Sequence, residues 1–227
     1  MSDLRPSPNL TVIYQKLYRG YGPQHWWPAD SAWEVVVGTI LTQNTAWKNV
    51  EAAISSLRAG HLLSLRKMAA VRRSVLARRI RPAGYFNVKA ARLKNFVSFL
   101  YRRHQGSLEK LWDRPVLALR QELLSVNGVG PETADSIILY AARKPIFVID
   151  AYTRRIFSRL GWISKNESYE DIQRIFMKRL PRRTRLFNEY HALVVAHAKN
   201  TCLARRPRCS ACVLNALCRY FSEAKTS

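Results

Sequence analysis

The stretch N-G-V-G-P-E-T-A-D, Asn127 to Asp135, decides how the rest of the chain is interpreted. Gly128 and Gly130 have the spacing of loops whose backbone a phosphate can approach closely. A nucleotide-binding P-loop would continue with Lys and then Ser or Thr, whereas this loop continues with Pro131 and Glu132. The stretch therefore indicates a phosphate contact of another kind, with carboxylates beside it.

Helical segments flank this loop on both sides. The run P-V-L-A-L-R-Q-E-L-L precedes it, and a second helix follows from Glu132. In a helix–hairpin–helix, the turn directs backbone N–H groups at an anion, and the second helix adds its positive N-terminal end. Such a motif holds a DNA phosphate without reading the base sequence. The residues expected to make this contact are Gly128, Val129 and Gly130.

The composition supports a polyanionic partner. The chain has 227 residues, with 38 Lys and Arg against 15 Asp and Glu, which gives a formal net charge of +23. A hydrophobic share of 48% is typical of a globular protein rather than a disordered one. The sequence has no apolar run of about 20 residues and no signal peptide, which predicts a cytoplasmic, nucleoid-associated protein in a reducing compartment.

The apolar spacing is helical almost throughout the chain. Ser31-x-x-Glu34 is a capping box at the start of one helix, and Asn87 is expected to cap another. The one strand-like run, residues 146–149, is short. We therefore predict an all-α fold of roughly ten helices, in two lobes with a DNA-binding cleft between them. The expected division is a six-helix domain, 25–144, with the hairpin, and a second lobe formed by 1–24 and 145–227.

Four cysteines close the chain with the spacing C-x6-C-x2-C-x5-C: Cys202, Cys209, Cys212 and Cys218. Disulfides are disfavoured in a reducing compartment, so one metal centre with four thiolate ligands is expected. Zinc usually takes two C-x2-C pairs, and the irregular spacing favours an iron–sulfur cluster, although the spacing alone leaves both open. The basic loop between the first two cysteines is either solvated charge or a DNA-backbone clamp: Arg205, Arg206 and Arg208.

Asp150 ends the apolar run F-V-I-D at the start of a helical segment. One interpretation makes it the N-cap of residues 151–160. The other makes it a partly desolvated catalytic carboxylate that faces the ligand held by the glycine loop. The residues alone leave both roles open.

These motifs together resemble the helix–hairpin–helix DNA glycosylase superfamily of endonuclease III. G-V-G-x-x-T-A, the aspartate of V-I-D, L-T-Q-N-T and the cysteine spacing occur in the expected order over nearly the whole chain. The resemblance implies a monomeric enzyme that flips a damaged base from double-stranded DNA and breaks its N-glycosidic bond. It also implies that Asp150 is catalytic, that Gln43 fills the space left by the flipped nucleotide, and that the cysteines hold a 4Fe–4S cluster.

One position departs from that family. Where endonuclease III has the lysine that forms a Schiff base with the sugar, this chain has Glu132. A carboxylate cannot form a Schiff base, so the AP-lyase reaction is doubtful and a monofunctional glycosylase that uses water is favoured. In the first turn of a helix, Glu132 also has an ordinary stabilising role.

The N-terminal third resembles the 3-methyladenine DNA glycosylase III branch, in H-W-W-P-A-D and R-P-A-G-Y-F-N-V-K-A. That resemblance implies an aromatic base pocket formed by Trp26, Trp27 and Trp47, although a core role for one of the paired tryptophans stays open. Aromatic faces attract the positive charge of N-alkylated purines. Lys199 matches an auxiliary lysine of the branch.

That branch lacks the cluster, so the chain resembles two subfamilies at once: one in its N-terminal third and the other in its cysteine spacing. The alternatives are a bifunctional glycosylase and AP lyase acting on oxidised pyrimidines, and a non-catalytic damage-binding protein.

Overall fold

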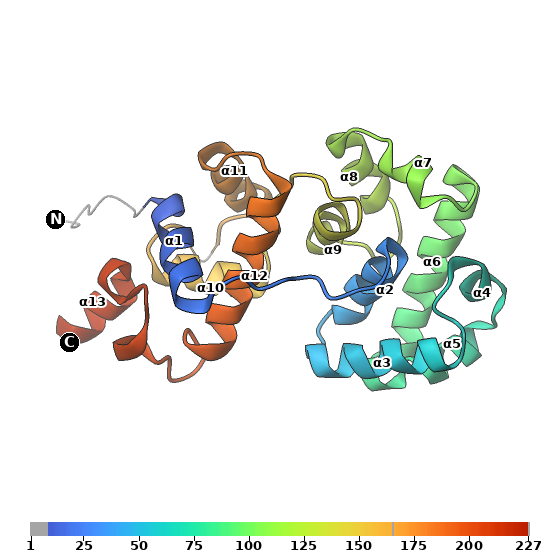
Figure 1. Ribbon diagram of the computed structural model, residues 1–227, viewed down its shortest axis with the longest axis horizontal. Coiled ribbons are helices and arrows are strands. Elements are labelled where there is room, and N and C mark those ends of the chain that lie inside the picture. Colours follow the sequence, from blue (N-terminus) through green and yellow to red (C-terminus); the bar gives the residue numbers. More distant parts are fainter. Residues whose placement is uncertain (1–8, 165, 227) are drawn as a thin grey trace. The chain divides into compact units, whose positions relative to one another are not determined.

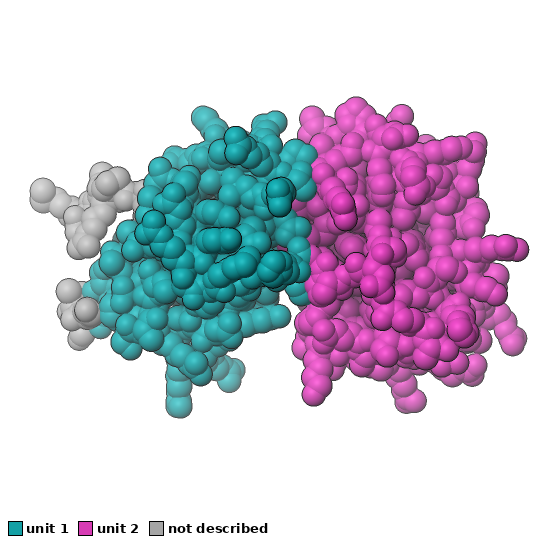
Figure 2. Space-filling model, in the orientation of Figure 1, with its two compact units in different colours: residues 1–26, 145–227 teal, residues 27–144 magenta. Residues whose placement is uncertain are grey.

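A computed structural model describes residues 9–164 and 166–226. In this part of the chain there are thirteen α-helices and no strand, which confirms the all-α prediction (Figure 1). The additional helices are short ones, such as α4 and α7, whose few residues carry little periodic signal. The chain forms two compact units: unit 1 is residues 1–26 with 145–227, and unit 2 is residues 27–144 (Figure 2).

Unit 2 is built around α2 (Ala32–Thr42), whose residues 33–41 are all buried. The Oγ of Ser31 accepts a hydrogen bond from the Glu34 amide at 3.1 Å, as expected for the N-cap of α2. The other elements of unit 2 are α3 (Trp47–Ala59), α4 (Leu65–Ala70), α5 (Arg73–Arg79), η1 (Arg81–Ala83), α6 (Phe86–His104), α7 (Leu108–Trp112), α8 (Val116–Leu124), α9 (Pro131–Ser136) and η2 (Ile137–Ala141).

The predicted N-cap of α6 is wrong. The helix begins at Phe86, so Asn87 lies inside its first turn, and the N-cap is Tyr85. Gly84 and Tyr85 have φ angles of +66° and +43°, and these left-handed residues turn the chain into the helix without a side-chain cap.

Unit 1 contains α1 (Leu10–Tyr21), α10 (Ala151–Arg159), α11 (Tyr169–Arg179), α12 (Thr184–Asn200), η3 (Cys209–Ala211), η4 (Asn215–Leu217) and α13 (Arg219–Thr226). Helix α12 packs against α1 and α10. Aromatic rings fill the core: Phe147 stacks on Phe176 with ring centroids 4.2 Å apart, and Tyr190 of α12 contacts both rings. This core fixes the start of α10, where Asp150 lies.

The strand-like run 146–149 is buried and extended but pairs with no other strand in the described residues. Side chains of α11 bind its peptide groups instead. Gln173 donates its amide to the Phe147 carbonyl at 2.6 Å, and the Tyr169 hydroxyl accepts from the Ile149 amide at 3.3 Å. The segment therefore leads into α10 without a sheet.

Candidate nucleic-acid interface and active site

The hairpin joins α8 to α9 with two glycines that have different roles. Gly128 has φ +94°, and a Cβ on it would lie 2.3 Å from Cγ of Arg92, so no larger residue fits without a shift. Gly130 is the N-cap of α9 with φ −91°, and a Cβ there would meet nothing within 4 Å. Val129 is buried, and its amide donates to the Val126 carbonyl at 2.9 Å.

The carboxylates beside the hairpin also differ in their surroundings. Asp135 is completely buried in an ion pair with Arg120 of α8, whose Nε is 2.8 Å from Oδ1. This pair ties α9 to α8, so Asp135 maintains the structure of the motif. Glu132 is exposed in the first turn of α9, where a carboxylate interacts favourably with the positive end of the helix.

Gln43, directly after α2, is hydrogen-bonded to the hairpin. Its Nε2 donates to the carbonyl of Gly128 at 3.0 Å and to Oγ1 of Thr133 at 2.9 Å, while Arg92 donates to its Oε1. Gln43 and the hairpin, two of the three features expected to bind DNA, are therefore in direct contact within unit 2.

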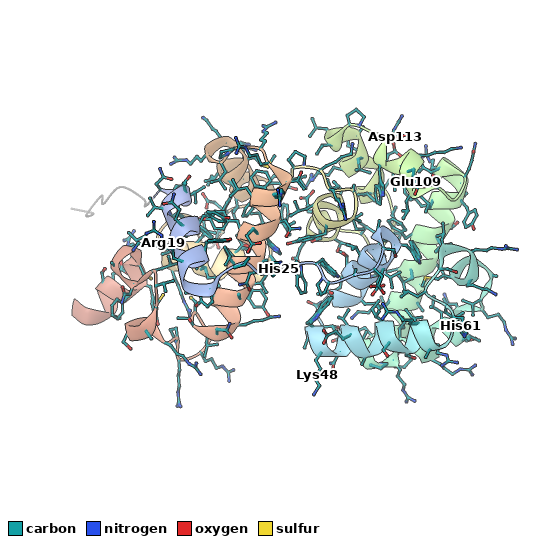
Figure 3. All side chains as sticks on the ribbon, in the orientation of Figure 1. Arg19, His25, Lys48, His61, Glu109 and Asp113 are labelled. Carbon is teal, nitrogen blue, oxygen red and sulfur yellow. The ribbon has the colours of Figure 1, made fainter. Side chains whose placement is uncertain are left out.

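Two of the three predicted pocket tryptophans come together in unit 2. Trp27 and Trp47 are edge to face, with ring centroids 5.2 Å apart, and Trp27 also contacts Tyr140. Trp26 belongs to unit 1, where it is the last residue of the first segment. Lys48, the residue after Trp47 in α3, is exposed and points outward from the helix (Figure 3).

Trp27 and Trp47 line a cavity of about 360 Å³ between the chain around Pro28, α2 and α3. The cavity contains more acidic than basic groups, which is unusual for so basic a chain. Glu51 accepts a hydrogen bond from the Trp47 indole at 2.7 Å, and Arg58 pairs with both Asp30 and Glu34. Three carboxylates against one guanidinium, beside two indole rings, favour a ligand that carries positive charge.

Asp150 combines both of its predicted roles in one carboxylate. It is the N-cap of α10, and its Oδ1 accepts hydrogen bonds from the Thr153 amide at 2.7 Å and the Thr153 hydroxyl at 2.8 Å. Its Oδ2 is not used by the cap and lies 3.5 Å from Nε2 of His191. Burial opposes ionisation, but His191 and the Thr153 donors outweigh it and hold the pKa of Asp150 below the ordinary value.

Lys199 lies near the end of α12, exposed to solvent. It is eight residues beyond His191, which corresponds to about 12 Å of helix rise. Over residues 9–164 and 166–226, no hydrogen bond or ion pair joins it to Asp150. Its position is closer in sequence to the cysteine loop than to the carboxylate.

The four cysteines line one small cavity of about 20 Å³ in unit 1, and their thiols are free. Burial raises the pKa of Cys212 to about 11, and the other three cysteines contribute to the shift, so the four sulfurs interact electrostatically. Nη1 of Arg159 is 3.2 Å from Sγ of Cys202, and Nε2 of His197 is 3.7 Å from Sγ of Cys212. No three His, Cys, Asp or Glu side chains of the described residues are arranged around a point that could hold one metal ion.

Arginines of α10 hold the loop that follows Cys202. Arg155 donates to the Cys202 carbonyl at 3.0 Å, and Arg159 donates to the Leu203 carbonyl at 2.7 Å. The predicted clamp residues of this loop are all exposed: Arg205, Arg206 and Arg208. Their guanidinium groups are therefore accessible to solvent, on a loop whose first residues are held by the arginines of α10.

The sequence interpretation missed three residues of these surfaces. His191 belongs to the apolar pattern of α12, and Arg92 belongs to the polar face of α6, so neither had a signal of its own. Tyr85 combines an exposed fraction of 72% with a φ of +43°, and strained exposed aromatic residues are often functional. The motif R-P-A-G-Y-F-N contains Tyr85, but a sequence does not report the φ angle of a residue.

Comparison with known proteins agrees with this arrangement. Residues 37–182 match the model of the HhH-GPD superfamily of base excision DNA repair proteins. A Methanocaldococcus jannaschii protein, provisionally described as a DNA repair glycosylase, is 49% identical over 91% of this chain and 94% of its own length. Endonuclease III of Sulfolobus acidocaldarius is 33% identical over 83% of this chain and 82% of its own.

Among solved structures, the H. pylori 3-methyladenine DNA glycosylase bound to 1,N6-ethenoadenine superimposes with a TM-score of 0.75 and 27% identity. The superposition covers 85% of this chain and 98% of that protein. None of the described helices has the length and hydropathy that crossing a membrane requires. With the family match over more than half of its length, this chain belongs to the HhH-GPD superfamily of base excision DNA repair proteins.

Proposed function

We propose that this protein is a monofunctional DNA glycosylase that hydrolyses the N-glycosidic bond of alkylated purines such as 3-methyladenine. The observation that carries the substrate class is the cavity of unit 2, where Trp27 and Trp47 lie with three carboxylates and one arginine. N-alkylated purines are cations, so indole faces and carboxylates both stabilise them. The likeness to a 3-methyladenine DNA glycosylase supports the same substrate class.

Asp150 is proposed as the catalytic carboxylate. Bond breaking produces an oxocarbenium-like sugar, and a buried carboxylate stabilises that positive charge strongly because little water screens it. The pKa of Asp150 lies below its ordinary value, so the group is ionised at neutral pH. The cap from Thr153 fixes the carboxylate through Oδ1 and leaves Oδ2 for the reaction.

Water is proposed as the nucleophile because Glu132 replaces the lysine expected of a lyase. A carboxylate in the first turn of α9 cannot attack the sugar as an amine does. A cationic alkylpurine leaves as a neutral base, so its departure needs no general acid. Both properties are consistent with simple hydrolysis.

DNA is proposed to lie against the hairpin, Gln43 and the arginine loop. Because the Val129 amide is bonded to Val126, we assign the phosphate contact to the amides of Gly128 and Gly130 and to the start of α9. Lys199 is proposed to contact a phosphate near the loop of Arg205, Arg206 and Arg208, because it lies next to that loop in sequence.

The four cysteines are proposed to hold a 4Fe–4S cluster. Each iron of such a cluster takes one thiolate, so the ligands surround a larger volume than those of a single zinc ion. The four free thiols that line one cavity supply one ligand for each of the four irons. The cluster would supply a rigid support for the basic loop. Iron and acid-labile sulfide in the purified protein would support it, and stoichiometric zinc would contradict it.

The function is tested by incubating the protein with duplexes that carry 3-methyladenine, an oxidised pyrimidine, uracil or a mismatch. We expect release of 3-methyladenine and a loss of roughly 10²–10⁴-fold in rate for Asp150→Asn. Asp171→Asn is the control, since Asp171 is a half-exposed carboxylate in the first turn of α11.

Borohydride trapping is run on the same substrates. A covalent adduct with the wild type would contradict the monofunctional mechanism and favour a lyase that uses another lysine. Release of no base from any duplex would contradict the enzyme assignment and favour a damage-binding protein.

A further inference from the structure

His191 is buried beside the carboxylate to which the proposed function assigns catalysis. Its exposed fraction is 7% and that of Asp150 is 9%, so both side chains lie away from bulk water. Nε2 of His191 is 3.5 Å from Oδ2 of Asp150. The imidazole therefore faces the one oxygen of Asp150 that the helix cap does not use.

His191 contacts Oδ2 of Asp150 and not Oδ1. Oδ1 already accepts two hydrogen bonds from Thr153, which fixes the plane of the carboxylate. A distance of 3.5 Å is longer than a good N–H···O hydrogen bond, and catalytic contacts in enzymes without substrate are often long in this way. Room thus remains for adjustment between Oδ2 and Nε2 when DNA is bound.

Helix α12 holds His191 in place. The preceding residue, Tyr190, is completely buried and donates its hydroxyl to the Leu10 carbonyl at 2.8 Å, which ties α12 to α1. The second histidine of the helix, His197, has another environment: Nδ1 lies 2.8 Å from the Tyr21 hydroxyl, and Nε2 faces Cys212. Of the two histidines of α12, it is His191 that faces Asp150.

We propose that His191 is a positioning residue of the glycosylase reaction, which orients Oδ2 of Asp150 and the water molecule that attacks the sugar. This inference rests on the proposed function. The water oxygen bonds to C1′, and the C1′–N bond breaks with its electron pair leaving on the base. A cationic alkylpurine thereby departs neutral. The proton of the water passes to Oδ2 of Asp150, which the N–H at Nε2 of His191 orients, and then returns to solvent.

A carboxylate alone could stabilise the sugar cation, but it would orient water poorly. Two groups that converge on one water fix both its position and the direction of its lone pair. His191 and Asp150 come from different helices, α12 and α10, which pack against each other within unit 1. The arrangement is thus held by the core of a single unit.

The test uses the full-length protein in single-turnover assays with the lesion duplex that the wild type cleaves. His191→Phe keeps a ring of similar size without the nitrogen, and His191→Gln restores an N–H donor. We expect His191→Phe to lower the rate of base release roughly 10–100-fold and His191→Gln to recover part of it. Affinity for a duplex with a non-cleavable abasic analogue should change less than about twofold, because the contact is to Asp150.

His104→Phe is the matched control, since His104 is an equally buried histidine that pairs with a carboxylate, Glu122, at 2.7 Å in unit 2. It should leave the rate unchanged.

A wild-type rate in His191→Phe would overturn the inference while leaving the glycosylase assignment intact. Equal losses of rate in the Phe and Gln variants, both with a lowered melting temperature, would also overturn it, because they would indicate a purely structural role. If the wild type releases no base, the proposed function fails and this inference fails with it.

Discussion

Gly128 and Gly130 share one short loop, but only Gly128 is sterically constrained. Gly128→Ala places a Cβ against Arg92 at a φ of +94° and should lower the free energy of unfolding by about 1–3 kcal/mol. Gly130→Ala has free space and an ordinary φ, so we expect a change within about 0.5 kcal/mol. Urea denaturation of both variants measures the difference.

A second change identifies the cause. Gly128→Ala should cost less in an Arg92→Ala background than in the wild type, because the side chain that the new Cβ would meet is then absent. Equal stabilities for the two alanine variants would contradict this account of the loop.

Asp150 shows why single residues are hard to assign from sequence. The sequence left a choice between a helix cap and a catalytic carboxylate, and in the structure Oδ1 accepts the cap hydrogen bonds while Oδ2 faces His191. That division depends on χ angles, which no pattern of letters reports. The contact with His191 joins positions 41 residues apart, and His191 resembled one more core residue of α12.

At the scale of elements, a row of polar side chains on α6 contacts both the loop after α2 and the hairpin. Lys89 donates to the carbonyls of Leu41 and Ala83, both at 2.8 Å, and Asn95 donates to the Asn127 carbonyl at 3.1 Å. Arg92 lies between them and contacts both Gln43 and Gly128. The spacing of three residues places all of them on one face of the helix. One helix therefore positions both the Gln43 loop and the hairpin.

Lys89 should make stability depend on pH. Burial, and secondarily the charge of Arg92, lowers the pKa of Lys89 from 10.5 to about 8. Between these two values the unfolded chain keeps a proton that the folded protein has released, so the contribution of Lys89 to the free energy of unfolding rises with pH. Below pH 8 the lysine is charged in both states, and the full cost of burying the charge is present.

Lys89→Met is the variant that tests this. It removes the titration and leaves two buried carbonyls without this donor, which should cost about 1–3 kcal/mol. Urea denaturation at pH 7 and at pH 10 should show a larger deficit of the variant at pH 10. Lys48→Met, at an exposed position of α3, is the control and should follow the wild type. A deficit that shrinks with pH would contradict the assigned direction.

The sequence predicted α6 as a helix but not its function as a connector. The helical spacing of the apolar residues that follow Asn87 was sufficient to identify the helix. The partners of its polar side chains left no local trace, because those of Arg92 and Asn95 lie 32 or more residues away in the sequence. The error at Asn87 has a similar origin, since the left-handed turn at Tyr85 follows from the fold.

At the scale of the whole molecule, the most general prediction concerns charge. The net charge of +23 was evident from composition and predicts strong, salt-sensitive binding to DNA of any sequence. Composition cannot distinguish binding by the electrostatic field of the whole protein from binding by a few direct contacts to phosphates. The anchored loop of Arg205, Arg206 and Arg208 offers that distinction, because its arginines are exposed on a segment held by α10.

Replacing these three arginines with alanine should weaken binding to an undamaged duplex and reduce the slope of log K against log salt by about 3, near 0.9 for each lost phosphate contact. The control replaces Arg72, Arg73 and Arg78, three exposed arginines at or near α5, and removes the same charge. If the loop contacts DNA directly, only the loop variant changes the slope by that amount. Equal changes in the two variants would show that the field of the whole protein, rather than the loop, determines its affinity for DNA.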